Sequence, residues 1–241
     1  MSGELAGKRA LVTGASKGIG LAISRALVTH GVDVVICGRD SQKLGEARDA
    51  LKGAGSGKVE SFVADVSKSG EVARLFEFVD KAFKGLDILV NNAGIGVFRT
   101  VRELSVEQWD RIIGTNLSGA FYCSREAVER FARSGGGSII NISSLAGKNP
   151  FSGGAAYNAS KFGLNGMSEA TMLDHRYDKV RVSYILPGSV DTEFAGHEVK
   201  ARSSWKVAPE DIAEIVLGVL RMPERTLISR IEVRPSRPEK N

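Results

Sequence analysis

Short apolar runs alternate with longer amphipathic segments along most of the chain. The short runs are mostly apolar at consecutive positions, as in DVVIC at residues 33–37, which is typical of parallel strands covered by helices on both faces. Such runs predict strands at 8–12, 33–37, 59–64, 88–90, 138–142, 180–186 and 227–233. Apolar positions three or four apart predict helices at 18–29, 41–51 and 70–83, within 106–133 and 155–177, and at 209–221.

This order of elements predicts an α/β fold with one doubly wound, parallel seven-stranded sheet flanked by helices. The glycine clusters at 53–57 and 135–137 are short enough to be turns rather than linkers. We therefore expect a single domain over residues 1–241 that ends in a polar tail at 234–241 (RPSRPEKN).

Composition and charge narrow the class of protein. Hydrophobic residues make up 42% of the chain, which is enough for a packed core and excludes disorder as the main state. No apolar run is long enough to cross a bilayer, and residues 1–4 lack the pattern of a secretory leader. Cys37 and Cys123 lie among apolar residues, so we expect reduced core thiols in a cytoplasmic protein. The net charge of +5 suits anionic ligands but does not indicate a nucleic-acid surface.

A glycine-rich segment follows the first predicted strand. Gly14, Gly18 and Gly20 lie in the sequence TGASKGIG at residues 13–20, directly before the first predicted helix. Glycine lets a backbone turn tightly and approach a pyrophosphate, and the free N–H groups of the helix that follows favour anions. The segment predicts a dinucleotide site, although a glycine turn needed only for close packing would look the same.

The end of the second predicted strand indicates which dinucleotide binds. A carboxylate at this point typically holds the ribose hydroxyls of NAD, whereas a cation favours the 2′-phosphate of NADP. Gly38 occupies the strand tip and Arg39 follows it, and Lys17 in the glycine segment can reach the same place. Asp40 is the competing signal for NAD, but we interpret it as the N-cap of the helix at 41–51. The expected cofactor is therefore NADP(H), with NAD(H) the less favoured alternative.

Tyr157 and Lys161 are four residues apart in a predicted helix, so both project from one face. A free tyrosine has a pKa of about 10, and a cation one turn away lowers that pKa and favours acid–base chemistry. An ordinary surface pair at this spacing is the alternative interpretation.

Ser144 ends the fifth predicted strand and lies thirteen residues before Tyr157. Sites in parallel sheets lie at the carboxyl ends of strands, so this hydroxyl is placed to donate to a carbonyl oxygen, with Ser143 as its rival. The sequence lacks Gly-x-Ser-x-Gly, which argues against acyl transfer. His30, His175 and His197 share no metal-ligand spacing, so no metal is assigned.

Taken together, these motifs resemble the classical short-chain dehydrogenases/reductases. The resemblance runs from about residue 8 to residue 233. It rests on residues 13–20, Asp65-Val66, NNAG at 91–94, Thr115-Asn116, Ser143-Ser144, Tyr157 with Lys161, and Pro187-Gly188 with Thr192. It implies a single-domain Rossmann fold and an oxidoreductase that interconverts a carbonyl and a secondary alcohol with NADP(H).

The resemblance also implies roles for individual residues. Tyr157 would be the proton donor, and Lys161 would lower its pKa and bind the nicotinamide ribose. Ser144 would hold the substrate oxygen, and Asn116 would support a water linked to Lys161. The implied cofactor-binding residues are Gly14, Ser16, Lys17, Gly18, Ile19, Gly20, Arg39, Asp65, Val66, Asn92, Ala93, Gly94, Tyr157, Lys161, Pro187, Gly188, Val190 and Thr192.

The substrate is not fixed by these motifs. A short lid at about 193–207 suggests an open site, and Phe98, Phe151, Phe194 and Trp205 suggest an apolar substrate, with core packing as the alternative. Reduction of 3-oxoacyl groups on acyl carrier protein is the leading named alternative, with an arginine row at 125, 130 and 133 as a possible carrier contact. The glycine-rich close that such enzymes usually carry near the C-terminus is missing from residues 228–237.

Two further expectations concern partners and class. The family's habit implies a homodimer or homotetramer through helices within 106–133 and 155–177, where Phe162, Leu164, Met167 and Met172 form an apolar set that also suits core packing. A non-catalytic NADP-binding sensor or scaffold on the same fold is the alternative from another class. The complete set of Asn116, Ser144, Tyr157 and Lys161 argues against it, because a sensor needs no proton donor.

Overall fold

A computed structural model describes residues 5–194, 203 and 205–238 of the chain. Its centre is one sheet of seven parallel strands in the order β3-β2-β1-β4-β5-β6-β7, which confirms the predicted fold class. The strands are β1 (Arg9–Thr13), β2 (Asp33–Gly38), β3 (Val59–Val63), β4 (Ile88–Asn91), β5 (Gly137–Ile142), β6 (Val180–Pro187) and β7 (Arg230–Val233). The strand β7 begins three residues later than predicted, because a turn at 223–226 precedes it and its ladder with β6 starts at Arg230.

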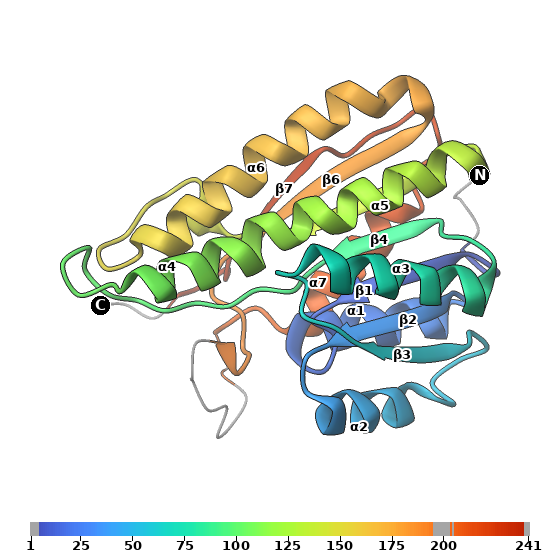
Figure 1. Cartoon of the computed structure of the whole chain (residues 1–241), viewed down its shortest axis with the longest axis horizontal. Helices are drawn as coiled ribbons and strands as arrows, with labels where there is room; N and C mark the ends of the chain where they lie inside the picture. The colour runs from blue at the N-terminus through green and yellow to red at the C-terminus, as the bar shows by residue number, and fades with distance from the viewer. Residues whose placement is uncertain (1–4, 195–202, 204, 239–241) are drawn as a thin grey trace.

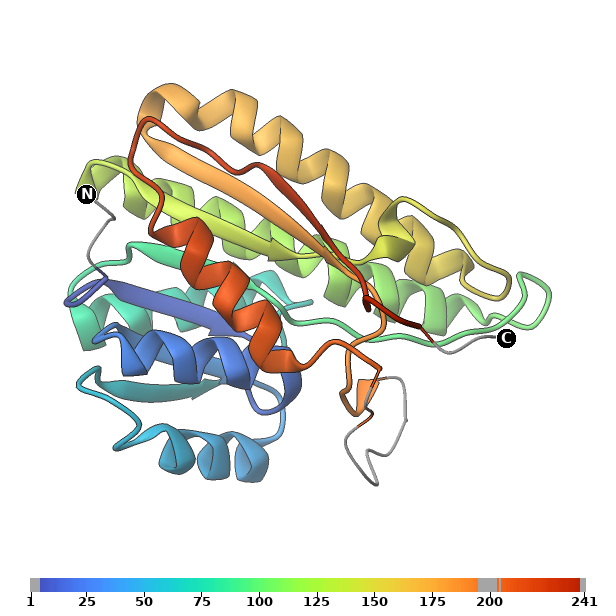
Figure 2. The ribbon, with the colours of Figure 1, turned by 180° about the vertical axis from the view of Figure 1, so that it is seen from behind.

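Helices cover both faces of the sheet. They are α1 (Gly18–Thr29), α2 (Ser41–Leu51), α3 (Ser69–Phe83), α4 (Val106–Ile113), α5 (Gly119–Ser134), α6 (Ala155–His175) and α7 (Pro209–Leu220). Figure 1 shows α3, α4, α5 and α6 on one face, and Figure 2 shows α1, α2 and α7 on the other. None of the described helices is long and apolar enough to cross a membrane.

The strands are apolar at consecutive positions because each face of the sheet has its own core. In β1, Ala10 and Val12 belong to the core under α1 and α7, whereas Leu11 between them belongs to the core under α3 and α5. Cys37 lies in the second core with Cys123, and both thiols are buried and unpaired. Burial raises the pKa of Cys37 to about 12, which keeps it an unreactive thiol.

The helix predicted within 106–133 contains an irregular turn that its sequence pattern does not show. A π-helical turn, η1 (Gly114–Ser118), joins α4 to α5, so the two helices run on almost continuously. Two 3₁₀ turns, η2 (Leu145–Gly147) and η3 (Arg176–Asp178), follow β5 and α6. Turns of the π type are rare and occur frequently at functional sites, and this one carries Asn116.

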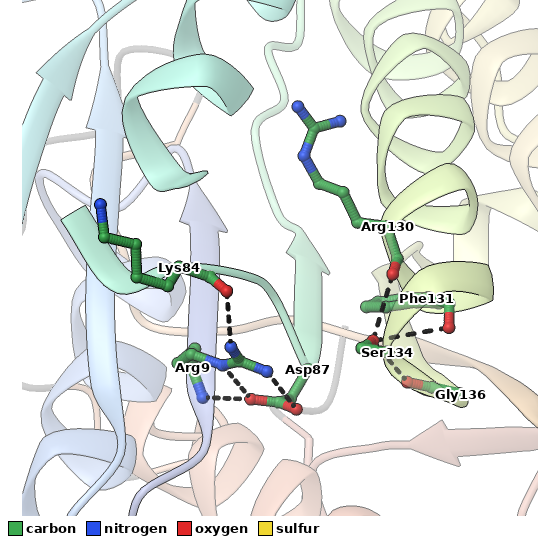
Figure 3. A network of polar contacts seen from close by, with 7 residues as sticks. All are labelled: Arg9, Lys84, Asp87, Arg130, Phe131, Ser134 and Gly136. Carbon is green, nitrogen blue, oxygen red and sulfur yellow. Dashed lines mark hydrogen bonds and ion pairs between the residues drawn. The ribbon is translucent and has the colours of Figure 1, made fainter. Parts of the chain in front are cut away.

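An ion pair joins the amino ends of β1 and β4, at the end of the sheet opposite the carboxyl ends of the strands (Figure 3). Arg9 donates from Nε to Asp87 Oδ2 at 2.7 Å and from Nη2 to Asp87 Oδ1 at 3.1 Å. The backbone N–H of Arg9 donates to the same carboxylate at 2.8 Å, and Arg9 Nη1 donates to the carbonyl of Lys84. Although burial alone would raise the pKa of Asp87, these bonds hold it below its usual value.

We expect Asp87→Asn to reduce the free energy of unfolding by about 1–3 kcal/mol at pH 7, since it removes the charge from a partly buried, doubly bonded pair. Because the folded-state pKa of Asp87 is lowered, its stabilisation is complete above the unfolded-state pKa of about 3.9 and is lost as the pH falls through the folded-state value. Urea unfolding at pH 7 and below pH 4 measures both effects. Asp49→Asn, which removes a charge from an exposed ion pair, is the control and should change the free energy of unfolding little. Equal losses of unfolding free energy in the two variants would contradict the prediction.

Candidate active site

The predicted catalytic residues lie together near the carboxyl ends of β4 and β5. Ser144 follows β5 by two residues, and Tyr157 and Lys161 lie on successive turns at the start of α6. Asn116 lies in the π-helical turn η1, which packs against α6. Parallel strands bring these segments to one edge of the sheet, although they are far apart in the sequence.

Of the two neighbouring serines, Ser144 is the one beside Tyr157. The hydroxyl of Ser144 lies close enough to Tyr157 to lower the pKa of that tyrosine, and Ser144 Oγ accepts from the backbone N–H of Ala146 at 3.1 Å. Ser143 Oγ instead donates to the side chain of Asn165, further along α6. The hydroxyl pair therefore involves Ser144 and not its neighbour.

Lys161 is buried near the N-terminus of α6. Its side chain is almost fully buried, and its Nζ donates to the carbonyl oxygen of Ile142, the last residue of β5, at 2.8 Å. The same Nζ lies 5.8 Å from the centre of the Tyr157 ring. Burial lowers the pKa of Lys161 to about 8, because an ammonium is costly to keep away from water.

The expectation that Lys161 lowers the pKa of Tyr157 is wrong for this structure. Burial raises the pKa of Tyr157 to about 12, and the hydrogen bond with Ser144 opposes this only in part. The Lys161 ammonium is bonded to the Ile142 carbonyl and is not among the groups that shift the tyrosine. Tyr157 therefore keeps its proton at neutral pH.

Asn116 ties the loop after β4 to α6. Its Oδ1 accepts from the backbone N–H of Ile95 at 2.8 Å, and its Nδ2 donates to the Ile95 carbonyl at 2.9 Å and to Ser160 Oγ at 3.1 Å. A Cβ added to Gly94 would lie 3.5 Å from Asn116 Oδ1 and 3.8 Å from Lys161 Nζ, so the three residues are neighbours. The implied water between Asn116 and Lys161 stays a prediction.

Close packing explains two of the three glycines in the turn after β1. Gly14 has φ +63°, and a Cβ there would come within 2.7 Å of Ala93 Cα. A Cβ on Gly20 would lie 2.4 Å from Asn92 Nδ2. That same amide group donates to the carbonyls of Thr13 and Gly14 at 3.0 and 2.9 Å, so it holds the turn in place. Sequence reasoning expected Asn92 to line a cofactor cleft and missed this role.

The start of α1 suits an anionic ligand. Its N-cap, Lys17, makes no side-chain capping bond, and no acidic residue lies in the first turn, which contains Gly18, Ile19 and Gly20. The first N–H groups of a helix carry partial positive charge and lack partners within the helix. A dinucleotide phosphate is the group that such a terminus, reached through a tight glycine turn, fits well.

The region around the tip of β2 matches the sequence predictions in most details. Asp40 is the N-cap of α2, since its Oδ1 accepts from the backbone N–H of Lys43 at 3.1 Å, which confirms that interpretation. A Cβ on Gly38 would lie 3.7 Å from the side chain of Ser16, so the glycine turn and the tip of β2 adjoin. Arg39 lies close enough to Asp65 for its charge to help lower the pKa of that carboxyl.

Three residues around this region have protein partners that the sequence did not indicate, and their contacts with a cofactor stay predictions. Lys17 Nζ donates to Glu193 at 2.8 Å. Asp65 accepts from the backbone N–H and the hydroxyl of Ser67. The side chain of Val66 is buried, and a Cβ on Gly119 of α5 would lie 2.9 Å from it.

The segment after β6 connects the serine to the glycine turn. Ser144 Oγ lies 3.5 Å from the carbonyl oxygen of Pro187, and the backbone N–H of Gly188 donates to Val233. Val190 pairs with Val207 in an isolated bridge, and a Cβ on Gly18 would lie 3.3 Å from Thr192. Residues 195–202 and 204 of the predicted lid, with His197, and 239–241 of the tail lie outside the described residues.

Aromatic rings enclose Tyr157. The ring centres of Phe98 and Phe194 lie 5.7 and 5.6 Å from that of Tyr157, and Phe151 packs edge-on against Phe98 at 5.4 Å. Trp205 makes no ring contact with these residues in the described part of the chain; the Lys206 ammonium lies over its ring instead. Three of the four predicted aromatic residues therefore form one apolar wall around the tyrosine.

Comparison with known proteins identifies the family of this chain. A family model described as short chain dehydrogenase matches residues 8–203. The chain belongs to the short-chain dehydrogenase family. It is 34% identical over 232 residues to an uncharacterised oxidoreductase of Staphylococcus saprophyticus, which covers 96% of this chain and 99% of that protein. It is 37% identical over 215 residues to a D-beta-hydroxybutyrate dehydrogenase of Rhizobium meliloti, over 87% of this chain and 83% of that protein.

Solved structures of this family superpose closely. A metagenomic short-chain oxidoreductase in complex with NADP has a TM-score of 0.86 and 38% identity, covering 98% of this chain and 100% of that chain. An alcohol dehydrogenase from the archaeon Thermococcus sibiricus, complexed with 5-hydroxy-NADP, has a TM-score of 0.89 and 28% identity, over 97% and 99% of the two chains. The short-chain dehydrogenase described here is thus an oxidoreductase by family.

We expect Lys161→Met to raise the free energy of unfolding at pH 7 by about 1–3 kcal/mol, because it removes a buried amine whose pKa falls from 10.5 to about 8. Between pH 8 and 10.5 the folded chain releases this proton while the unfolded chain keeps it, so wild-type stability rises with pH and the advantage of the variant shrinks. Denaturant unfolding at pH 7, 9 and 10 measures this trend. Lys81→Met, at an exposed position of α3, is the control; a Lys161→Met protein less stable than wild type at pH 7 would contradict the prediction.

Proposed function

We propose that this protein is an NADP(H)-dependent oxidoreductase that interconverts a carbonyl and a secondary alcohol. The observation that carries the proposal is the placement of the Ser144 hydroxyl beside Tyr157, next to buried Lys161 and among aromatic rings. The cofactor, when bound, supplies or accepts the hydride. The glycine turn, the start of α1 and Arg39 are the groups that would hold its phosphates.

The protein's own part in the reaction concerns the substrate oxygen. In reduction this oxygen gains negative charge, and a proton must reach it as the C–O bond lengthens. Tyr157 remains protonated at neutral pH because burial raises its pKa to about 12, so it is suited to donate that proton. Ser144 can donate a second hydrogen bond to the same oxygen.

The choice of NADP(H) rests on charge at the tip of β2. Gly38 leaves no carboxylate there for ribose hydroxyls, Asp40 is engaged as the N-cap of α2, and Arg39 is the adjacent cation. Two solved relatives hold NADP or a hydroxylated NADP, which supports the same choice.

The aromatic wall around Tyr157 supports an apolar ketone or aldehyde as substrate. The acyl-carrier-protein alternative loses support, because the middle residue of its arginine row is occupied. Arg130 donates to Asp80 at 2.8 Å and to Glu126 at 2.8 Å, and only 13% of its side chain is exposed. Relatives named as D-beta-hydroxybutyrate dehydrogenases keep small hydroxy acids in the test panel.

The test is a panel of apolar ketones, aldehydes, 3-oxo acids and 3-oxoacyl thioesters, assayed with NADPH and with NADH by nicotinamide absorbance. We expect turnover with NADPH on apolar carbonyls. Tyr157→Phe should lower kcat by about 10² or more, because it removes the proton donor and keeps the ring packing. Its NADPH affinity should be unchanged. Full kcat in this variant, or NADPH binding without turnover on any carbonyl, would favour the sensor or scaffold alternative.

A matched pair of serine variants controls for the register of the site. Ser144→Ala removes the hydroxyl beside Tyr157, whereas Ser143→Ala removes the one bonded to Asn165. We expect the first change to reduce kcat far more than the second, with NADPH binding retained in both. A larger loss of kcat in Ser143→Ala would mean that Ser143, and not Ser144, contacts the substrate oxygen.

We also propose that the chain forms a homo-oligomer through α5 and α6. Phe121, Phe162 and Leu173 leave between 45% and 58% of their surface exposed on these helices, and Tyr177 in the turn after α6 is 91% exposed. Leu164 is buried, so it belongs to the core and not to the expected interface. Burying such apolar side chains favours association of two copies. Light scattering should give the mass of a dimer or tetramer, and Phe162→Asp should shift it toward one chain.

A further inference from the structure

Glu193 contacts the glycine turn from the start of the predicted lid. Lys17 Nζ donates to Glu193 Oε2 at 2.8 Å, across 176 residues of sequence, and about half of each side chain is exposed. This bond lowers the pKa of Glu193, and the charge of Lys43 lowers it further. The Glu193 carboxylate is therefore ionised at neutral pH and faces two lysines from different elements.

Both lysines border the place proposed for the adenosine end of the cofactor. Ser16, next to Lys17, adjoins Gly38 at the tip of β2, and Arg39 follows that tip. Lys43 lies in the first turn of α2, bonded through its backbone N–H to Asp40. Thr192, next to Glu193, contacts Gly18. A protein carboxylate thus lies beside the cations expected to receive a phosphate.

We propose that Glu193 is a specificity-determining residue that competes with the cofactor's 2′-phosphate for Lys17. The inference rests on the proposed NADP(H) function and deepens it. A 2′-phosphate must share the Lys17 ammonium with Glu193 or displace Glu193 from it, and in either case it lies close to a second anion. A cofactor with a 2′-hydroxyl leaves the ion pair intact. Glu193 therefore weakens NADP(H) binding, leaves NAD(H) binding unchanged, and narrows the preference that Arg39 and Lys17 create.

The size of the effect follows from the exposure of the pair. An ion pair between half-exposed side chains contributes little, and its removal changes a binding constant by roughly two- to fivefold. Salt should reduce the effect, since screening weakens exposed charges. The expected change is small, and its measurement therefore needs two probes that differ only in the 2′-phosphate.

The experiment measures binding of 2′,5′-ADP and of 5′-AMP to the full chain by calorimetry at low salt. Four proteins are compared: wild type, Glu193→Gln, Lys17→Ala and the double variant. We expect Glu193→Gln to tighten binding of 2′,5′-ADP about two- to fivefold and to leave 5′-AMP unchanged. In the Lys17→Ala background the same change should add little. Glu214→Gln is the matched control, because Glu214 lines the groove between α1 and α7 that Lys17 and Glu193 also line.

Several outcomes would overturn the inference. Weaker binding of 2′,5′-ADP to Glu193→Gln would mean that Glu193 orients Lys17 for the phosphate. An equal change for both probes, or an equal effect of Glu214→Gln, would mean that no competition at the phosphate exists. If the wild type prefers 2′,5′-ADP and Glu193→Gln does not change its binding, only this inference fails. If the wild type shows no preference between the two probes and Lys17→Ala changes neither affinity, the proposed NADP(H) preference fails too.

Discussion

The geometry of the site depends on the polar bonds that tie α6 to the end of β5. Buried Lys161 donates to the Ile142 carbonyl, and Ser143 and Asn141 bond to Asn165 and Ser168 further along α6. Tyr157 lies one turn earlier on that helix, and Ser144 lies two residues beyond Ile142. These buried bonds together set the separation of the two hydroxyls, and a shift of α6 along its axis would separate them.

Two asparagines connect segments that the sheet alone leaves independent. Asn92 closes the glycine turn against the end of β4, and Asn116 joins the loop after β4 to α6. The Asn92 amide donates to two backbone carbonyls, and the Asn116 amide bonds to the backbone of Ile95 and to Ser160, so both hold their segments rigidly without burying a charge. The glycine turn and the start of α6 are both bonded to the same short loop, residues 92–95. The distance between them is therefore held constant.

The fold could be predicted from the sequence because each parallel strand carries apolar residues toward two separate cores, as Ala10, Leu11 and Val12 do. The choice of Ser144 over Ser143 as the neighbour of Tyr157 also followed from spacing. The pKa of Tyr157 could not be predicted in this way, because its burial comes from rings at 98 and 194, far from it in sequence. The partner of Lys17 is equally remote, and local pattern does not indicate which carboxylate a lysine meets.

The π-helical turn at Gly114–Ser118 has a consequence for how this chain can change in length. An α-helix turns by about 100° per residue, so a wider turn offsets the phase of α5 against α4. Removing one residue there would restore a regular helix but rotate one half against the other. Either the Asn116 amide would leave Ile95 and Ser160, or the faces that α5 presents to α3 and β4 would lose their fit. The helix is therefore tolerant of substitutions on its outer surface and intolerant of a single deletion at its centre.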